Sequence, residues 1–263
     1  MHIIVCIKQV PETTEVKINP ETNTLVREGV ASIINPFDMY AIEEALRLKE
    51  RFEAKTTVIT MGPPQAKDAL REALSMGIDE AILLSDIAFA GSDTWATSLV
   101  LAAVIEKIGN FDLIICGKQA SDGDTAQVGP GVAAHLDLPQ ATYVRKIDSI
   151  HLDTTPRMMV TERLLEEGYE VVELSLPALI TVVKEINEPR LPSLRGKMKA
   201  RKAEILTWTN SDLNIDESQI GLKGSPTQVV KIFTPAQKEG GEIFEGEPED
   251  TVEKLSKVIK ELL

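Results

Sequence analysis

Short apolar runs alternate with amphipathic stretches along the first two-thirds of the chain, and this alternation constrains the fold more than any other feature. Strand-like length and continuous hydrophobicity are shared by residues 2–7, 56–61, 81–85 and 111–116. Helical periodicity follows the turns at residues 35–38, 62–64 and 91–93, and it returns over residues 128–136. Continuous apolar strands separated by helices predict an α/β fold, with a mostly parallel sheet that helices cover on both faces.

The pattern changes after residue 139. Strand-like segments then follow one another without helices between them, at residues 143–150, 157–164, 170–174 and 179–183. They predict an antiparallel extension of the sheet. From Glu204 the chain is rich in Gly, Pro and polar residues, and a helix with an apolar stripe begins at Pro248. A long irregular stretch is unusual inside a compact domain, so we expect residues 1–203 to form a nucleotide-binding domain and residues 204–263 an arm that packs on another subunit.

The composition argues against several classes of protein. A formal net charge of −13 opposes binding to nucleic acid or to an anionic membrane surface. No apolar run approaches the roughly 20 residues of a bilayer-spanning helix, and no signal-peptide pattern is present. The two cysteines, Cys6 and Cys116, lie within apolar runs, and the three histidines have no metal-ligand spacing. We therefore expect a cytoplasmic protein with reduced thiols and no metal site.

The stretch from Gly117 to Pro130 is the strongest candidate for a binding site. It joins the end of a predicted strand to the start of a predicted helix, where unpaired N–H groups and the helix dipole favour a phosphate or diphosphate. Gly117, Gly123 and Gly129 would let backbone approach a ligand closely. The pattern is neither a Walker A loop nor a G-x-G-x-x-G fingerprint. An ordinary strand-to-helix turn is therefore the alternative for this stretch alone.

Three further turns support the binding interpretation. Small and polar residues also occupy residues 6–11, 61–63 and 90–97, each of them at the end of a predicted strand. Parallel strands bring their carboxyl ends to one edge of the sheet, which is where open α/β sheets bind ligands. We therefore favour a nucleotide site over a set of ordinary loops. No nucleophile elbow or Ser/His/Asp arrangement is recognisable, so any chemistry is expected to belong to a bound cofactor.

A proline-bracketed loop with two leucines, residues 188–195, precedes a basic stretch in this acidic chain. The stretch contains Lys197, Lys199, Arg201 and Lys202. One interpretation is a solvated helix face. The other is a docking edge for an acidic partner, because leucines in a proline-stiffened loop lose little entropy on binding.

The chain resembles the beta subunit of electron transfer flavoproteins along nearly its whole length. The motifs that carry the resemblance lie at residues 5–11, 35–38, 43–45, 117–127, 163–181 and 187–190. Glu167 stands where Gly or Asp is commoner in the family, a departure that we regard as harmless. The resemblance implies an adenine nucleotide alpha-hydrolase-like fold and a heterodimer with an alpha subunit that holds the electron-carrying FAD.

The resemblance also implies which residues bind. The adenosine part of a nucleotide is expected to contact Cys6, Asn35, Pro36, Phe37, Asp38, Met61, Gly117, Lys118, Gln119, Ala120, Ser121, Asp122, Gly123, Asp124, Thr125, Ala126, Gln127 and Val128. A partner dehydrogenase, of the acyl-CoA type or another flavin dehydrogenase, is expected to dock on Glu188, Pro189, Arg190 and Leu194. Leu194 would be the anchor that enters an apolar pocket of that partner.

The family has two forms, which differ in the nucleotide of the beta subunit. In one form AMP is structural. In the other, a second FAD accepts hydride from NADH and passes one electron to the alpha-subunit FAD and one to a low-potential acceptor such as ferredoxin or flavodoxin. This chain resembles the second form at residues 89–97, 122–130 and 221–227. Thr94 and Thr97, one helical turn apart, are expected to face one diphosphate. An unrelated nucleotide-binding protein of the stress type remains a third alternative.

Overall fold

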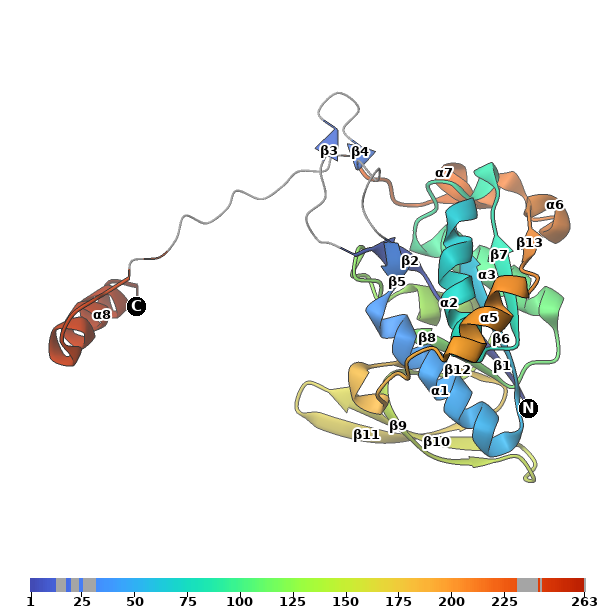
Figure 1. Cartoon of the computed structure of the whole chain (residues 1–263), viewed down its shortest axis with the longest axis horizontal. Helices are drawn as coiled ribbons and strands as arrows, with labels where there is room; N and C mark the ends of the chain where they lie inside the picture. The colour runs from blue at the N-terminus through green and yellow to red at the C-terminus, as the bar shows by residue number, and fades with distance from the viewer. Residues whose placement is uncertain (13–17, 20–23, 26–31, 231–240, 242, 263) are drawn as a thin grey trace. The chain divides into compact units, whose positions relative to one another are not determined.

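The computed structural model describes residues 1–12, 18–19, 24–25, 32–230, 241 and 243–262. The chain divides into two units, Met1–Val230 and Lys231–Leu263. Most predicted elements lie in the first unit, whose sheet Figure 1 shows between layers of helices. The second unit contributes the helix α8 (Pro248–Leu262).

The main sheet has the strand order β11-β10-β9-β12-β8-β1-β6-β7-β13. Its parallel centre consists of β1 (His2–Cys6), β6 (Lys55–Met61), β7 (Glu80–Leu84) and β8 (Leu113–Gly117). These four strands pair in parallel, as predicted, and Ile4 lies opposite Thr57 on one side and Ile114 on the other. The alternation of apolar strands and helices therefore predicted the centre of the sheet correctly.

Helices cover both faces of the sheet, as expected. On one face, α1 (Pro36–Phe52), α2 (Lys67–Met76) and α5 (Leu194–Lys202) pack on side chains such as Ile3 and Val5. On the other face, α3 (Thr94–Ile108) and α4 (Val128–His135) pack on Ile4 and Cys6. Successive residues of β1 thus enter opposite cores, as the pleat of a strand requires. Because both faces are buried there, residues 3–6 of β1 are all apolar.

The antiparallel extension is partly as predicted. β9 (Gln140–His151), β10 (Met158–Leu165) and β11 (Gly168–Ser175) form an antiparallel meander. The prediction was wrong for residues 179–183, because β12 (Ala178–Val182) lies between β8 and β9 and runs parallel to both. All five residues of β12 are buried. Such an apolar run indicates a central strand but carries no information on its direction.

Two short sheets and several short helices complete the described chain. β2 (Gln9–Pro11) pairs with β5 (Ser32–Ile34), and β3 (Ile18–Asn19) pairs with β4 (Thr24–Leu25). The 3-10 helices are η1 (Pro64–Ala66), η2 (Ile87–Phe89), η3 (Lys184–Ile186) and η4 (Glu217–Gln219). The remaining α-helices are α6 (Asn210–Leu213) and α7 (Gly221–Gly224).

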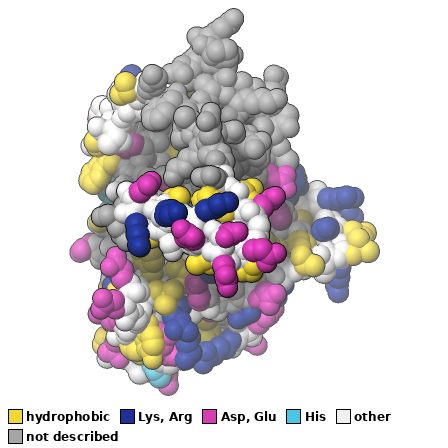
Figure 2. All heavy atoms as spheres, turned by 90° about the vertical axis from the view of Figure 1, so that its left-hand side faces the viewer, with side chains coloured by type: hydrophobic (Ala, Val, Ile, Leu, Met, Phe, Trp, Pro, Cys, Tyr) yellow, Lys and Arg dark blue, Asp and Glu magenta, His cyan; other side chains and the backbone are white. Residues whose placement is uncertain are grey.

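The division of the chain lies later than the expected boundary at residue 203. β13 (Leu206–Trp208) extends the main sheet beside β7, so the residues after Glu204 begin as part of the first unit. Within the second unit, α8 exposes the apolar side chains Val252, Leu255 and Ile259. Figure 2, in which α8 faces the viewer, shows hydrophobic side chains beside charged ones of both signs. Within the expected arm, residues 231–240 and 242 lie outside the described residues.

Candidate functional site

The carboxyl ends of the parallel strands meet at one edge of the sheet, and the predicted turns lie there. β1, β6, β7, β8 and β12 all run in the same direction. Residues 7–9, 62–66, 85–93 and 118–127 follow the first four of these strands. Met61 ends β6 at this edge and is partly buried, and Cys6 and Cys116 lie opposite each other near the ends of β1 and β8. Both thiols are buried and free.

Two side chains at the start of α1 connect the loops after β1 and β8. Asn35 is 1% exposed, and its Nδ2 donates to Asp38 Oδ1 (2.9 Å) and to the Gln119 carbonyl (2.8 Å). The Ser121 N–H donates to Asn35 Oδ1 at 3.0 Å. Asn35 and Asp38 were predicted to contact a nucleotide, whereas the structure shows their side chains engaged with neighbouring protein groups. Pro36 is exposed between them.

Burial raises the pKa of Asp38 from 3.8 to about 7, against hydrogen bonds from Asn35 and from the N–H groups of Lys8 and Gly117, which lower it. The Lys8 N–H donates to Asp38 Oδ2 at 2.7 Å. A carboxyl that is fully enclosed thus titrates near neutral pH, at the junction of three segments. Strong perturbation of this kind is commoner at functional sites than elsewhere.

The glycines of the predicted binding stretch have different roles. A Cβ on Gly117 would lie 2.3 Å from Asp38 Oδ1 and 2.7 Å from the Phe37 carbonyl carbon. A Cβ on Gly129 would lie 2.6 Å from Thr181 Cγ2. Gly117 and Gly129 are therefore required by packing within the protein, whether or not their backbone also approaches a ligand. A Cβ on Gly123 would meet nothing within 4 Å.

The outer part of the loop after β8 is open to solvent. Ser121, Asp122, Gly123, Asp124 and Thr125 are all exposed. Lys8 Nζ lies 2.6 Å from Asp122 Oδ1, and Gln119 Nε2 donates to Asp124. Asp124 has φ 51°, a left-handed conformation that costs a residue other than glycine about 1 kcal/mol or more. Strain of this kind, held by neighbouring ion pairs and hydrogen bonds, is typical of binding loops.

A second loop residue, Ala126, is also left-handed at φ 55°. It directly precedes Gln127, the N-terminal cap of α4, where no side chain caps the helix. The Thr94 hydroxyl donates to Gln127 Oε1 at 3.0 Å, which joins the start of α3 to the start of α4. The first turn of α4 thus offers backbone N–H groups that no capping side chain occupies. Val128 and Thr97 lie partly buried at these two helix starts.

The segment 221–227 is bound to the start of α3. Asp93 caps α3 by accepting from the Ala96 N–H (3.1 Å), and its other oxygen accepts from the N–H and the hydroxyl of Thr227 (2.9 and 2.8 Å). The Asp93 N–H donates to Ser225 Oγ at 2.8 Å. Together with the Thr94–Gln127 bond, these bonds bring together the three segments 89–97, 117–128 and 221–227, which we call the rim. These segments were predicted to lie at one site, but nothing in the sequence indicated Asp93 and Thr227 as the link between them.

Lys118 lies against two aromatic rings beside the rim. Its Nζ is 4.9 Å from the ring centre of Tyr143 and 5.8 Å from that of Phe37. Tyr143 has φ 61°, and its N–H donates to Thr181 Oγ1 at 3.1 Å. A cation over aromatic faces is held by cation–π attraction. No sequence motif indicated Tyr143, because its position depends on β9 lying beside β12. Ala120 accepts from the N–H of Asp124 within the same loop.

The predicted docking loop is held on α1 through Arg190. Its Nε lies 2.8 Å from Glu43 Oε2, its backbone N–H also donates to Glu43, and its guanidinium pairs with Glu50. Burial alone would raise the pKa of Glu43, but the hydrogen bonds from Arg190 outweigh it and lower that pKa. Arg190 therefore has an internal role, whereas Leu194 is 78% exposed at the start of α5. Glu188 is exposed and Pro189 partly buried.

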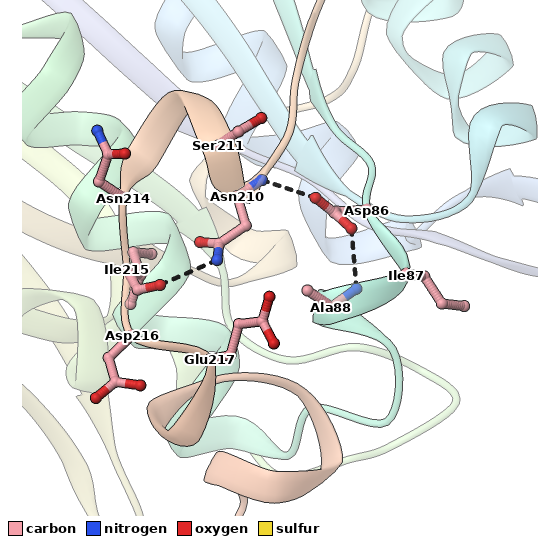
Figure 3. Close-up of a pocket in the computed structure, with 9 residues that line it drawn as sticks. All are labelled: Asp86, Ile87, Ala88, Asn210, Ser211, Asn214, Ile215, Asp216 and Glu217. Carbon is pink, nitrogen blue, oxygen red and sulfur yellow. Dashed lines mark hydrogen bonds between the residues drawn. The ribbon is translucent and has the colours of Figure 1, made fainter.

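A shallow groove of about 660 Å³ lies beside the end of β7. Figure 3 shows its lining residues, with Asp86 accepting from the N–H groups of Ala88 and Asn210. No site residue was predicted in this groove. Among the described residues, none forms a group of three or more side chains that could hold a metal ion. No helix in the described part of the chain is long and apolar enough to cross a bilayer.

The chain is similar to known electron transfer flavoproteins over most of its length. The family described as "Electron transfer flavoprotein domain" matches residues 22–213. The chain is 54% identical to the electron transfer flavoprotein subunit beta of Thermoanaerobacterium thermosaccharolyticum, over 97% of this chain and 96% of that protein. It is 50% identical to the caffeyl-CoA reductase-Etf complex subunit CarD of Acetobacterium woodii, over 94% and 92%, and 51% identical to FixA of Azotobacter vinelandii, over 89% and 84%.

The chain therefore belongs to the electron transfer flavoprotein beta subunit family. This confirms the family named from its motifs and rules out the unrelated stress-type protein.

Proposed function

We propose that this chain is the beta subunit of a heterodimeric electron transfer flavoprotein and that the rim binds FAD. One observation carries the cofactor assignment. Three segments far apart in the sequence are hydrogen-bonded into one rim at the carboxyl ends of parallel strands, through Thr94–Gln127 and Asp93–Thr227. Dinucleotides bind in α/β sheets at such edges.

The chemistry of the rim fits a dinucleotide. Its carboxylates are engaged by protein groups, Asp122 by Lys8, Asp124 by Gln119 and Asp93 by Thr227, which reduces their repulsion of phosphates. The uncapped first turn of α4 presents backbone N–H groups and the positive end of a helix dipole. Small, exposed side chains between them leave space for a large ligand.

FAD bound here would accept hydride from NADH and pass single electrons to the alpha-subunit FAD and to a low-potential acceptor such as ferredoxin or flavodoxin. The chain's own residues would bind the diphosphate, orient the cofactor and limit its contact with water. AMP with a structural role is the second candidate. It is favoured by an aromatic content of only 4%, which leaves few rings to stack on a flavin.

The nucleotide content of the protein copurified with its alpha subunit tests the proposal. Acid release followed by chromatography should give two FAD per heterodimer. One FAD and one AMP would assign the structural role instead and would refute bifurcation. Replacing Thr94 and Thr97 together by valine should deplete the FAD of the rim and spare the other one, and unchanged flavin content would remove both threonines from the site.

The partners follow from exposed apolar side chains. Val252, Leu255 and Ile259 form a stripe on α8, and we propose that the arm that ends in α8 packs on the alpha subunit. Leu191 and Leu194 are 91% and 78% exposed beside the basic helix α5, and this surface would dock a flavin dehydrogenase of the acyl-CoA type or a related one. The complex would work in the cytoplasm.

A further inference from the structure

Hydrogen-bond donors surround Asp38 on both of its carboxylate oxygens. Oδ2 accepts from the Lys8 N–H at 2.7 Å, and Oδ1 accepts from Asn35 Nδ2 at 2.9 Å. The Gly117 N–H bonds the same carboxylate. Each of these partners is a donor. A protonated carboxyl would direct its own O–H at one of them and leave a buried donor without an acceptor.

Asn35 extends these bonds to the open loop. Its N–H donates to the Lys8 carbonyl at 2.8 Å, and its side chain bonds the Gln119 carbonyl and the Ser121 N–H. The start of α1 therefore holds the backbone of the loops after β1 and β8. The last residue of the loop after β8 that Asn35 contacts is Ser121, which is also the first exposed residue of that loop.

We propose that Asp38 is a positioning residue of the nucleotide site: its ionised carboxylate, through Asn35 and Gly117, holds the loop after β8 in the conformation that receives the nucleotide. The inference rests on the proposed nucleotide site but applies to FAD and to AMP alike. Loss of the charge at Asp38 releases a donor at Lys8, Asn35 or Gly117 and loosens residues 117–121.

The surroundings of Asp38 set the pH range of the effect. Lys8 follows β1 and is paired with Asp122, while Cys6 and Cys116 lie on β1 and β8. The Lys8 charge lowers the pKa of Asp38, and burial, the largest influence, raises it to about 7. The positioning carboxylate is therefore lost as pH falls through about 7. If only the ionised form binds, the dissociation constant at pH 6 should be about tenfold that at pH 8.

The test measures the binding of FAD and of AMP, in separate titrations, to the heterodimer stripped of exchangeable nucleotide, between pH 6 and pH 8.5. Wild type should show the tenfold rise, and Asp38→Asn should bind more weakly at every pH with no such rise. Glu44→Gln is the matched control: Glu44 is a buried carboxyl on the same helix, its pKa is also raised by burial, and it bonds Asn187 instead of the loop. It should keep the wild-type profile.

A second readout separates this inference from the proposed function. Hydrogen-exchange protection factors of residues 117–121, measured without added nucleotide, should fall below pH 7 in wild type and be low at all pH in Asp38→Asn. The positioning role would be overturned by protection of residues 117–121 that does not change with pH in wild type, or by a wild-type pH response in Asp38→Asn. If the protection follows Asp38 while neither nucleotide binds at any pH, the proposed function fails and the positioning role stands.

Discussion

Alanine substitutions at Gly117 and Gly123 test the packing of the binding loop. Gly117 ends β8 and Gly123 lies in the loop that follows it, and neither has a positive φ. A Cβ at position 117 would be 2.3 Å from Asp38 Oδ1 and 2.8 Å from the Asp38 backbone nitrogen, separations that Cβ atoms do not adopt. Neither atom can move freely, because one belongs to a buried carboxylate and the other to the first turn of α1. A Cβ at position 123 would meet nothing within 4 Å.

The expected magnitudes follow from these contacts. Overpacking at Gly117 should cost about 1–3 kcal/mol, since the start of α1 must shift. The same change at Gly123 should be neutral or stabilise by up to about 1 kcal/mol, because alanine restricts the unfolded chain. For a chain of this size each kcal/mol shifts Tm by roughly 2–4 °C, so Gly117→Ala should melt about 2–12 °C lower than wild type.

Thermal unfolding of the copurified heterodimer, followed by circular dichroism and by nucleotide release, measures both effects. Gly117→Ala should lose stability and nucleotide together, while Gly123→Ala should keep both. Equal melting temperatures for the two variants would refute the packing argument. If Gly117→Ala is destabilised but keeps its normal nucleotide content, the packing at Gly117 contributes to stability and not to nucleotide binding.

Three further predictions concern α1 and the docking loop. Arg190→Leu leaves the buried Glu43 with Arg47 as its remaining ion-pair partner and should destabilise the protein by about 1–2 kcal/mol in denaturant unfolding. Glu50→Gln, at an exposed partner of Arg190, should cost less than about 1 kcal/mol. Leu194→Ala should leave Tm unchanged and slow electron transfer to the dehydrogenase, measured by stopped-flow kinetics. Burial raises the pKa of Glu44, so Glu44 keeps its proton to higher pH in the folded protein than in the unfolded chain. The contribution of Glu44 to stability therefore falls as pH rises. The difference in Tm between Glu44→Gln and wild type should accordingly be more positive at pH 8 than at pH 5.

The sequence predicted elements best where burial decides the residue type. The strands at residues 2–7 and 111–116 were found because both faces of the central sheet are covered, which makes most positions apolar. The same uniformity hid the direction of β12, since a fully buried strand has no alternation that could assign it to a parallel or an antiparallel neighbour. Its placement depends on contacts with β8 and β9, and these are set by tertiary packing.

The candidate site was predicted at the level of segments and less well at the level of side chains. Motifs at residues 35–38 and 117–127 do meet at the carboxyl edge. The sequence could not show that Asn35 and Asp38 face inward, because small polar residues at a helix start are equally suited to capping, to ligands and to loop bonds. Asp93 was noticed only as part of a turn, and its bond with Thr227 spans a large separation in the chain.

The ionisation of Asp38 affects the stability of the fold as well as the order of the loop. Its folded-state pKa of about 7 exceeds 3.8, so the folded protein binds the extra proton and this group's contribution to stability falls as pH rises between these values. Above pH 7 the ionised form costs about 4 kcal/mol relative to an ordinary exposed carboxyl, an upper bound for a group of this kind. A neutral side chain of similar size would avoid that cost. An ionised carboxylate at the base of the rim therefore weakens the fold in the pH range where it orders the loop, and stability and binding should respond to pH in opposite directions.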